Sequence, residues 1–388
     1  MSRRTLRGSA AVAGVSETTV YRRGGSGRSQ TQLALAAILR ACADAGVPPR
    51  QVDGFVSFGY DANSGTRLAS ALGVDELRWS SLVWGGGGGG VAAAVGQAAA
   101  AIHAGQARVV AVCRSLAEED TGRVNLAGTH FGPHYRAHGV VTPAQLCALR
   151  IQRLLEVDGV PLSALEAVVL ASYHHAQRNP GAMAYGRPLD AEAYRSARWI
   201  SEPLRLFDCS RETDGAAAVI LTTPEHAEAL RSDPVYVLAA AQAGGARWGE
   251  LLENDEDYTS SGFRPVAQRL WTDSGLGPGD VDVIQVYENF SGAAVASLID
   301  HGFCTVADAG PRLTFENLVA PSGGLPINTS GGNLAEGYLQ GLGLVVEAVR
   351  QLRKESPNPV PDARVSLVAG GPMAPLVSSV LFGTADVL

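Results

Sequence analysis

A run of six glycines, Gly85–Gly90, directly precedes the small-residue stretch VAAAVGQAAAAI, which predicts a helix over residues 91–104. Glycine loses more backbone freedom on folding than any other residue, so the run is costly unless something approaches the backbone closely. The free N–H groups at the helix N-terminus would then face a ligand or an oxyanion. Tight helix packing is the alternative explanation.

Nucleotide sites are not indicated by the same glycines. Gly85, Gly87 and Gly90 satisfy GxGxxG, but any run of six glycines does, and Cys113 and Arg114 stand where a dinucleotide site usually has an acidic residue. A Walker-type phosphate loop is excluded by the missing GK[ST]. The turn therefore predicts backbone donors rather than a nucleotide cofactor.

Histidines and cysteines are the other candidate chemical groups. Glycine and proline separate five histidines, and no Asp or Cys completes a tetrahedral set, so we expect pocket-lining roles and no metal at His130, His134, His138, His174 and His175. Five cysteines are scattered without a CxxC motif, which predicts free thiols in a reducing compartment for Cys42, Cys113, Cys147, Cys209 and Cys304.

Bulk composition limits the partners. The 388 residues are 46% apolar and 18% charged, with a formal net charge of −7, which is typical of a compact chain long enough for two domains and argues against a nucleic-acid partner. No apolar run reaches the ~18 residues of a membrane span, and the first residues do not resemble a signal peptide. We expect a cytoplasmic protein with no membrane partner.

The elements that must position these groups are repeated. Residues 43–58 align without gaps to residues 272–287, each reading as helix end, turn and buried strand. In register with this, the glycine run, helix 91–104 and strand 107–113 match SGGNLAEGYLQGLG, helix 342–353 and strand 363–371.

The repeat predicts an α/β fold with a duplicated, layered arrangement of mixed but mostly parallel sheets covered by helices. We expect an N-terminal half over residues 1–230, with a substrate-contacting insertion at about 114–200, and a C-terminal half over 231–388.

Four stretches carry a family resemblance: HGVVTPAQ at 138–145, residues 179–222, VYENF at 286–290 and NTSGGNLAEGYLQGLG at 328–343. With the duplication, they resemble the thiolase superfamily, in its sterol-carrier and lipid-transfer-protein branch. The resemblance spans essentially the whole chain and implies the thiolase-like αβαβα fold.

The sequence departs from true thiolases in the chemistry. Thiolases of this branch carry a nucleophilic cysteine at the start of the helix and a histidine in each of two motifs, one HDCF-like and one GHP-like. Here the cysteine position falls within Gly85–Gly90, and the two motifs read Tyr287-Glu288-Asn289-Phe290 and Gly337-Tyr338-Leu339. No cysteine stands near these positions, so acyl transfer through a thiolate is not expected. Phenols at both histidine places resemble the retro-aldolases of steroid side-chain degradation, which cleave β-hydroxyacyl-CoA thioesters.

Chemistry supports that reading, because a retro-aldol step needs an acid and a base but no acyl-enzyme. A phenol with a reference pKa of about 10 can donate a strong hydrogen bond to an enolate, and a nearby cation would let it accept a proton from an alcohol. We therefore expect Tyr287 and Tyr338 to be the acid/base pair, in either order, with Asn289 near the thioester oxygen. A tyrosine ending a buried strand is also typical of a core, so that alternative stays open for Tyr287.

Further candidates concern substrate binding. Backbone N–H groups of Gly87 and Gly88 would face the thioester, and Glu288 and Glu336 could tune the phenols or be solvated loop carboxylates. His130, Tyr258 as a third phenol, and Arg187, with Arg178 and Arg198, complete the set, the arginines as partners of coenzyme A. Coenzyme A is expected only as part of the substrate, with no permanently bound cofactor.

The resemblance also implies an assembly: a homodimer, joined by a small OB-fold and zinc-ribbon partner into a heterotetramer. Small-residue runs such as VAAAVGQAAAAI would fit tight packing near the dimer interface. Two alternatives to the lyase stay open: a noncatalytic lipid-binding or scaffold subunit, and a secondary-metabolism enzyme that forms carbon–carbon bonds or transfers acyl groups on the same fold.

Overall fold

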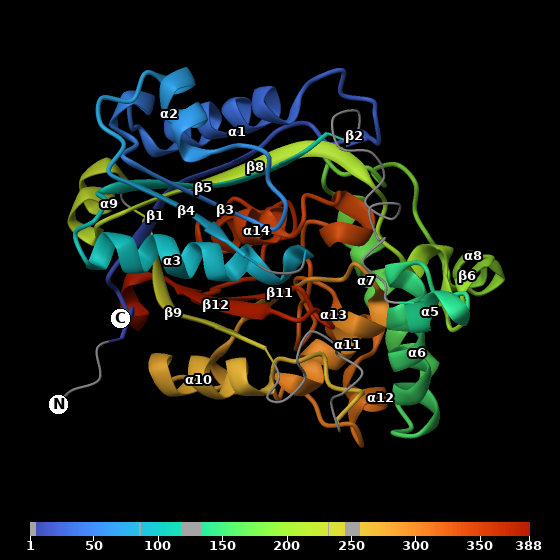
Figure 1. Cartoon of the computed structure of the whole chain (residues 1–388). Helices are drawn as coiled ribbons and strands as arrows, with labels where there is room; N and C mark the ends of the chain where they lie inside the picture. The colour runs from blue at the N-terminus through green and yellow to red at the C-terminus, as the bar shows by residue number, and fades with distance from the viewer. Residues whose placement is uncertain (1–4, 85–86, 118–132, 232, 245–256) are drawn as a thin grey trace.

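The computed structural model describes residues 5–84, 87–117, 133–231, 233–244 and 257–388. These form the expected α/β layers (Figure 1). Helices α1 (Gln30–Ala45) and α2 (Gly65–Leu72) cover the outside of one half of the sheet. Helices α3 (Val91–His103) and α14 (Leu342–Leu352) lie between the two halves. Helix α10 (Arg264–Ser274) covers the outside of the other half, so the αβαβα order is confirmed.

The strands of both halves join into one sheet through a short antiparallel contact between β1 and β9. In spatial order they are β10 (Val283–Val286), β11 (Val365–Gly370), β12 (Val377–Gly383), β9 (Val235–Ala243), β1 (Ala11–Glu17), β8 (Thr213–Thr222), β5 (Val109–Leu116), β3 (Gly54–Phe58) and β4 (Trp79–Val83), with β2 (Tyr21–Arg22) beside β8.

Strand direction corrects one expectation. The pairings β3–β4, β3–β5 and β10–β11 are parallel, whereas β1–β8, β1–β9, β5–β8, β9–β12 and β11–β12 are antiparallel. The sheet is mixed, as expected, but it is not mostly parallel in the part described. Each half adds antiparallel strands to its parallel βαβ unit, and apolar runs do not reveal strand direction.

The repeated sequence corresponds to repeated structure. Helices α1 and α10 both end at a glycine in the left-handed region, Gly46 and Gly275, and a proline-led 3₁₀ turn precedes β3 and β10. Asp53 accepts hydrogen bonds from the backbone N–H of Val109 at the start of β5 (2.8 Å), as Asp282 does from Val365 at the start of β11 (2.9 Å). The shared aspartates therefore fix the same strand junction in each copy.

The small residues of α3 pack in the interior of the protein. The helix packs against β3 and β5 on one side and β9 and β12 on the other, and most of its side chains are fully buried. Alanines and glycine let two sheet halves approach a single helix closely. The burial of this run within one chain accounts for its small residues, and its nearness to a dimer interface stays a prediction.

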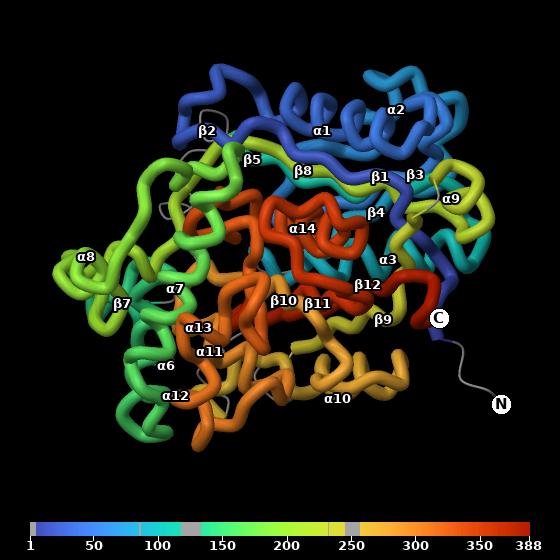
Figure 2. Tube along the Cα trace, turned by 180° about the vertical axis from the view of Figure 1, so that it is seen from behind, coloured from blue at the N-terminus to red at the C-terminus, as the bar shows by residue number. Residues whose placement is uncertain are grey.

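All but one of the remaining described helices gather at one end of the layers (Figure 1 and Figure 2). They are α5 (Pro133–Ala137), α6 (Pro143–Glu156), α7 (Leu162–Ala176), α8 (Ala191–Ser196), α11 (Ser291–Asp300), α12 (Ala309–Arg312) and α13 (Phe315–Leu318), with the hairpin of β6 (Trp199–Ser201) and β7 (Leu204–Arg205); α9 (Pro224–Leu230) lies at the opposite end. No helix in the described ranges is long and apolar enough to cross a membrane.

Candidate active site

The ring of Tyr287 explains one member of the glycine run, Gly88. A Cβ built on Gly88 would lie 2.0 Å from Cε2 of that ring and 2.6 Å from its hydroxyl oxygen. On the other side, a Cβ on Gly341 would lie 2.6 Å from Cδ2 of the same ring. Only residues without a side chain admit the phenol between the turn before α3 and the turn before α14. The hydroxyl of Tyr287 thus occupies the space that a side chain at Gly88 would fill.

A second glycine loop closes on the same turn. A Cβ on Gly371 would lie 2.1 Å from the backbone nitrogen of Gly89, so the loop after β11 passes directly over the glycines. The Ser378 hydroxyl donates to the carbonyl of Gly89 (2.6 Å) and accepts from the N–H of Ala93 (3.1 Å). These contacts fix the turn over Gly87–Gly90, a 3₁₀ segment leading into α3. Gly85 and Gly86 lie outside the described residues.

The two phenols are in direct contact. The Tyr287 hydroxyl donates a hydrogen bond to the hydroxyl oxygen of Tyr338 over 2.7 Å, and their rings meet edge to face with centroids 6.0 Å apart. Tyr287 is 2% exposed, whereas Tyr338 is half-buried. The Thr213 hydroxyl donates to the Tyr338 carbonyl (2.7 Å) and holds its loop. Tyr338 is therefore the more accessible phenol of the pair.

The environment differentiates the two phenols. Burial raises the pKa of Tyr287 well above its ordinary value, and the proton it donates to Tyr338 raises this pKa further. Burial also raises the pKa of Tyr338, but the hydrogen bond received from Tyr287 and the positive charge of Arg114 act against that rise. Tyr338 is accordingly the better proton acceptor of the pair, and Tyr287 keeps its proton.

Glu288 supports the loop that carries Tyr338. Its carboxylate is fully buried and accepts from the backbone N–H of Leu334 and the side chain of Asn333, both over 3.3 Å. A Cβ on Gly332 would lie 1.8 Å from its Oε1, so that glycine is needed to admit the carboxyl group. Burial raises the pKa of Glu288 to about 8. Glu288 thus joins the end of β10 to the π-helical turn Gly332–Glu336.

Asn289 follows in the same motif and is half-buried. Its Oδ1 accepts from the N–H of Phe290 (3.1 Å), and its carbonyl accepts from the N–H of Ser210 (2.9 Å). The side-chain Nδ2 is the group of Asn289 that could donate to an oxyanion. Its role near the thioester stays a prediction.

Other predicted site residues have contacts elsewhere. Glu336 accepts from Ser330 and from Asn179 (2.8 Å), so its described contacts tie the π-helical turn to the loop after α7. Tyr258 packs against the buried guanidinium of Arg150, whose Cζ lies 5.3 Å from the ring centroid. These contacts hold both side chains in place, and their part in substrate binding stays a prediction.

The candidate cation and the candidate histidine stay untested. Arg187 is exposed in the turn after Ala184, and His130 lies outside the described residues. Among the other histidines of that stretch, His175 is fully buried and accepts from the N–H of Ala320 (2.9 Å) through Nε2, and burial lowers its pKa to about 3.

The five cysteines do not have the properties of nucleophiles. All five are free thiols, and burial raises the pKa of each, for example to about 11 for Cys42 and about 12 for Cys304. A buried thiol with a raised pKa is a poor nucleophile.

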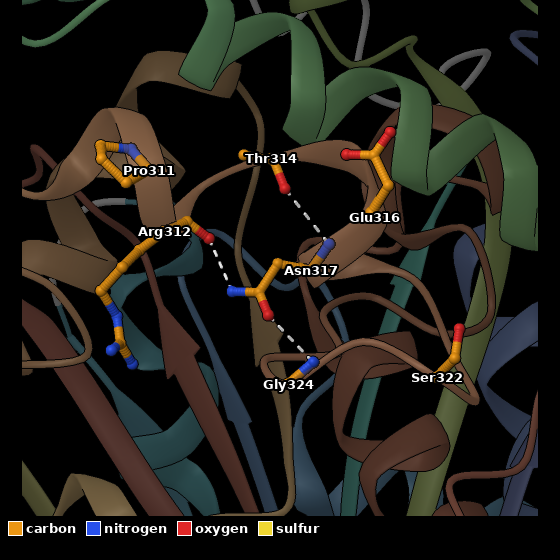
Figure 3. A pocket seen from close by; sticks show the side chains of 7 residues that line it. All are labelled: Pro311, Arg312, Thr314, Glu316, Asn317, Ser322 and Gly324. Atoms are coloured by element: carbon orange, nitrogen blue, oxygen red, sulfur yellow. Dashed lines mark hydrogen bonds between the residues drawn. The ribbon is translucent and has the colours of Figure 1, made fainter.

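A surface hollow of about 480 Å³ near α12 and α13 is a second candidate site (Figure 3). Asn317 stands in its centre, but its side chain donates to the Arg312 carbonyl (2.7 Å) and accepts from the N–H of Gly324 (3.0 Å). These hydrogen bonds hold the surrounding loop in place. The hollow therefore offers no group comparable to the phenol pair.

Three polar residues of the site were missed in the sequence: Asp61, Arg114 and Gln340. Arg114 stands in the otherwise uncharged strand VVAVCRSL and is 3% exposed. Its Nη1 lies 3.1 Å from Oδ2 of Asp61. Its Nε donates to Oε1 of Gln340. A lone arginine within a buried strand was the available signal, because a buried charge needs a partner.

Comparisons with known proteins place the chain in a family. Residues 244–382 match the "Thiolase C-terminal domain-like" family model. The chain is 36% identical to a "17-hydroxy-3-oxo-4-pregnene-20-carboxyl-CoA lyase" of Mycobacterium tuberculosis, covering 97% of this chain and 100% of the relative. It is 35% identical to a "Steroid side-chain-cleaving aldolase" of Thermomonospora curvata, covering 97% and 98%.

Among solved structures, an "Ltp2-ChsH2(DUF35) aldolase" superposes with a TM-score of 0.90 at 34% identity, covering 98% of this chain and 99% of that one. Identity at this level over nearly the whole of both chains, together with the layered fold and the phenols at the site, shows that the chain belongs to the thiolase superfamily, in the group of thiolase-like aldolases.

Proposed function

We propose that this chain cleaves a β-hydroxyacyl-CoA thioester by a retro-aldol reaction, without a covalent intermediate. The observation that carries the proposal is the 2.7 Å hydrogen bond between Tyr287 and Tyr338. It lies beside Gly88, within the stretch where the resemblance places a nucleophile. The relatives named lyase and aldolase support the same reaction class.

The reaction begins at the more accessible phenol. Tyr338, as the phenolate, accepts the proton of the β-hydroxyl, the carbon–carbon bond between the α- and β-carbons breaks, and a ketone and a thioester enolate form. We propose that neutral donors hold the enolate oxygen. These donors are the side-chain Nδ2 of Asn289 and the backbone N–H groups of Gly87 and Gly88. No acyl-enzyme forms, because no bond to the protein is needed.

The second phenol completes the proton balance. Tyr287 gives its proton to the α-carbon of the enolate, directly or through an intervening water, and becomes a phenolate. The proton now on Tyr338 then crosses the 2.7 Å hydrogen bond to Tyr287, which restores the starting state. One proton is thereby moved from the hydroxyl oxygen to the α-carbon, and no cofactor is consumed.

The names of two relatives suggest the substrate class. A steroid with a hydroxyl on the ring carbon that bears a three-carbon thioester side chain, so that this hydroxyl is β to the thioester carbonyl, would yield a steroid ketone and propionyl-CoA. The names of both relatives support this substrate. Coenzyme A is then part of the substrate, and Arg187 is proposed as a partner of its anionic groups.

The direct test supplies the purified chain with such a 17-hydroxy steroid thioester and measures the ketone and propionyl-CoA, with and without a DUF35-type partner protein. Ketone release that requires the enzyme supports the proposal. No release from any β-hydroxyacyl-CoA under either condition would leave the noncatalytic scaffold as the better explanation. Acyl transfer without ketone release would favour the secondary-metabolism alternative.

A partner protein is part of the proposal because the similar solved structure is named as an aldolase with a DUF35 component. We propose that this chain likewise binds a small partner with an OB-fold and a zinc ribbon, and that two copies of each chain form a heterotetramer.

The homodimer at the centre of that assembly is proposed to form along strand β4. This strand pairs only with β3 among the described strands, so it is a sheet edge, and Leu82 is 46% exposed on it with Trp84 83% exposed just beyond. An exposed apolar edge strand is a template for pairing with another chain. A two-fold axis there would pair β4 with β4 of a second copy.

Light scattering of the wild-type chain at micromolar concentration is expected to give the mass of a dimer. Leu82→Lys places a charge on the edge and is expected to shift the mass toward the monomer. The matched variant Leu39→Lys changes a similarly exposed leucine on α1 and is expected to leave the dimer intact. A stable wild-type monomer would contradict the proposed interface.

A further inference from the structure

Arg114 stands apart from the other charged residues because its side chain joins three segments at the phenol pair. It starts from β5, reaches Asp61 in the loop after β3, and donates from Nε to the Gln340 side chain two residues after Tyr338. Its side chain is 3% exposed and that of Asp61 is fully buried. Burying an ion pair costs more than its attraction commonly returns, so the pair needs a reason beyond stability.

We propose that Arg114 is a positioning residue of the phenol pair: held by Asp61 and Gln340, it fixes the loop that carries Tyr338 and supplies a buried positive charge to the phenol that accepts the substrate proton. The inference rests on the proposed retro-aldol function, and it adds a residue to which that reaction had assigned no role.

The loop contact is the first support. Gln340 has a φ of 53°, in the left-handed region that residues with a side chain rarely adopt, and it is followed by Gly341 at 88°. Strain of this kind persists only where surrounding contacts impose it. The hydrogen bond from Arg114 is such a contact, and the Thr213 bond to the Tyr338 carbonyl holds the other side of the loop.

The anchoring of Asp61 is the second support. Its carboxylate accepts from the Ser57 hydroxyl (2.7 Å) and from the N–H of Asn63 (2.7 Å), so it cannot swing away from the guanidinium. Arg114 is therefore held from both ends, and its charge is fixed relative to the phenols.

The charges that face the phenols are unequal. Arg114 lowers the pKa of both Tyr287 and Tyr338 against the effect of burial, while Glu288 raises that of Tyr287 and Glu212 raises that of Tyr338. Glu212, and Glu288 once pH exceeds its pKa of about 8, act in the opposite sense, so removing the guanidinium would leave the phenolate opposed by burial and by negative charge. The cleavage rate would then rise with pH only at more alkaline values than in the wild type.

The test variant replaces both charges by neutral groups of similar shape, Arg114→Gln with Asp61→Asn, so that no unpaired charge stays buried. We expect kcat/KM at neutral pH to fall about 10- to 100-fold, with the rise of activity shifted to higher pH by about one to two units. Ultraviolet titration of the phenolate, taken as the difference from a Tyr338→Phe background, should shift in the same direction.

The matched control is a second arginine–aspartate pair away from the site. Arg353 has a fully buried side chain whose Nη1 lies 2.9 Å from Oδ2 of Asp44. Arg353→Gln with Asp44→Asn is expected to lower the melting temperature while leaving the pH profile and the phenolate titration unchanged. A shift of the same size in the control would overturn the specific role of Arg114.

Gln340→Gly tests the positioning role separately, because glycine accepts the left-handed backbone and this variant should fold. We expect kcat to fall about 10-fold through loss of loop position, and unchanged kcat would overturn that role. An unchanged phenolate titration in the Arg114 and Asp61 double variant would overturn the electrostatic role. Absence of cleavage in the wild type would overturn the proposed function instead, since the titration does not depend on substrate.

Discussion

Replacing Tyr338 with phenylalanine is expected to lower kcat about 10²- to 10⁴-fold, the usual contribution of a positioned general base. The substitution keeps the ring, which is half-buried, and removes only the hydroxyl that accepts the bond from Tyr287. Packing should therefore survive, and KM should change little. Steady-state release of the ketone from the β-hydroxyacyl thioester is the measurement.

Tyr287→Phe is expected to reduce kcat as well, because it removes the proton donor and the hydrogen bond that favours ionisation of Tyr338. The two phenols act as one unit, so the double variant should lose about as much as the worse single variant rather than the product of both. Tyr236→Phe is the control: Tyr236 is also buried and donates to Glu228 (2.7 Å), but it lies on β9. Cleavage near the wild-type rate in both site variants would refute the phenol mechanism.

Much of the fold could be predicted because its signals are local and repeated. The aligned aspartates Asp53 and Asp282 perform the same task in both copies, so the repeat reported a real structural unit. Strand direction could not be predicted in the same way. Buried apolar strands such as β8 and β12 read alike whether their neighbours run parallel or antiparallel, since the pairing depends on connections distant in sequence.

The site was predicted in part. Tyr287 and Tyr338 are predictable because they stand at the histidine positions of the thiolase pattern. The glycine run is predictable as a place of close contact because glycine loses the most backbone entropy on folding. Glu336 is close to Tyr338 in sequence, but its hydrogen bonds to Ser330 and Asn179, set by the π-helical turn, are not predictable from that closeness. Adjacency along the chain does not decide which way a side chain points in an irregular turn.

Arg114 and Asp61 illustrate what sequence alone could not supply. They are separated by more than fifty positions and neither belongs to a recognised motif, so only the folded sheet, which places β5 beside β3, reveals the pair. The same holds for Ser378, whose hydroxyl caps the glycine turn from the far end of the chain.

Gly88→Ala is expected to have the second large effect, because a methyl group there would lie 2.0 Å from the Tyr287 ring. Gly341 limits movement of the ring on its opposite side, so the clash must displace the phenol or the turn. Overpacking of this kind costs about 1–3 kcal/mol of stability. A displacement of about 1 Å at a catalytic group can cost about 10²-fold in rate, so kcat should fall by at least that factor.

Melting temperature and kcat, measured together, separate a packing effect of Gly88→Ala from a loss of the catalytic phenol's position. Gly279→Ala is the control, since Gly279 also lies in a 3₁₀ turn but a Cβ there meets nothing within 4 Å, and neither melting temperature nor kcat should change. In Gly88→Ala/Tyr287→Leu the smaller side chain makes room for the methyl group, so the melting temperature should recover while cleavage stays low. If the double variant regains its melting temperature but not its activity, position 88 must be glycine because the Tyr287 ring fills the space of a side chain there. Cleavage at the wild-type rate in Gly88→Ala would contradict this explanation.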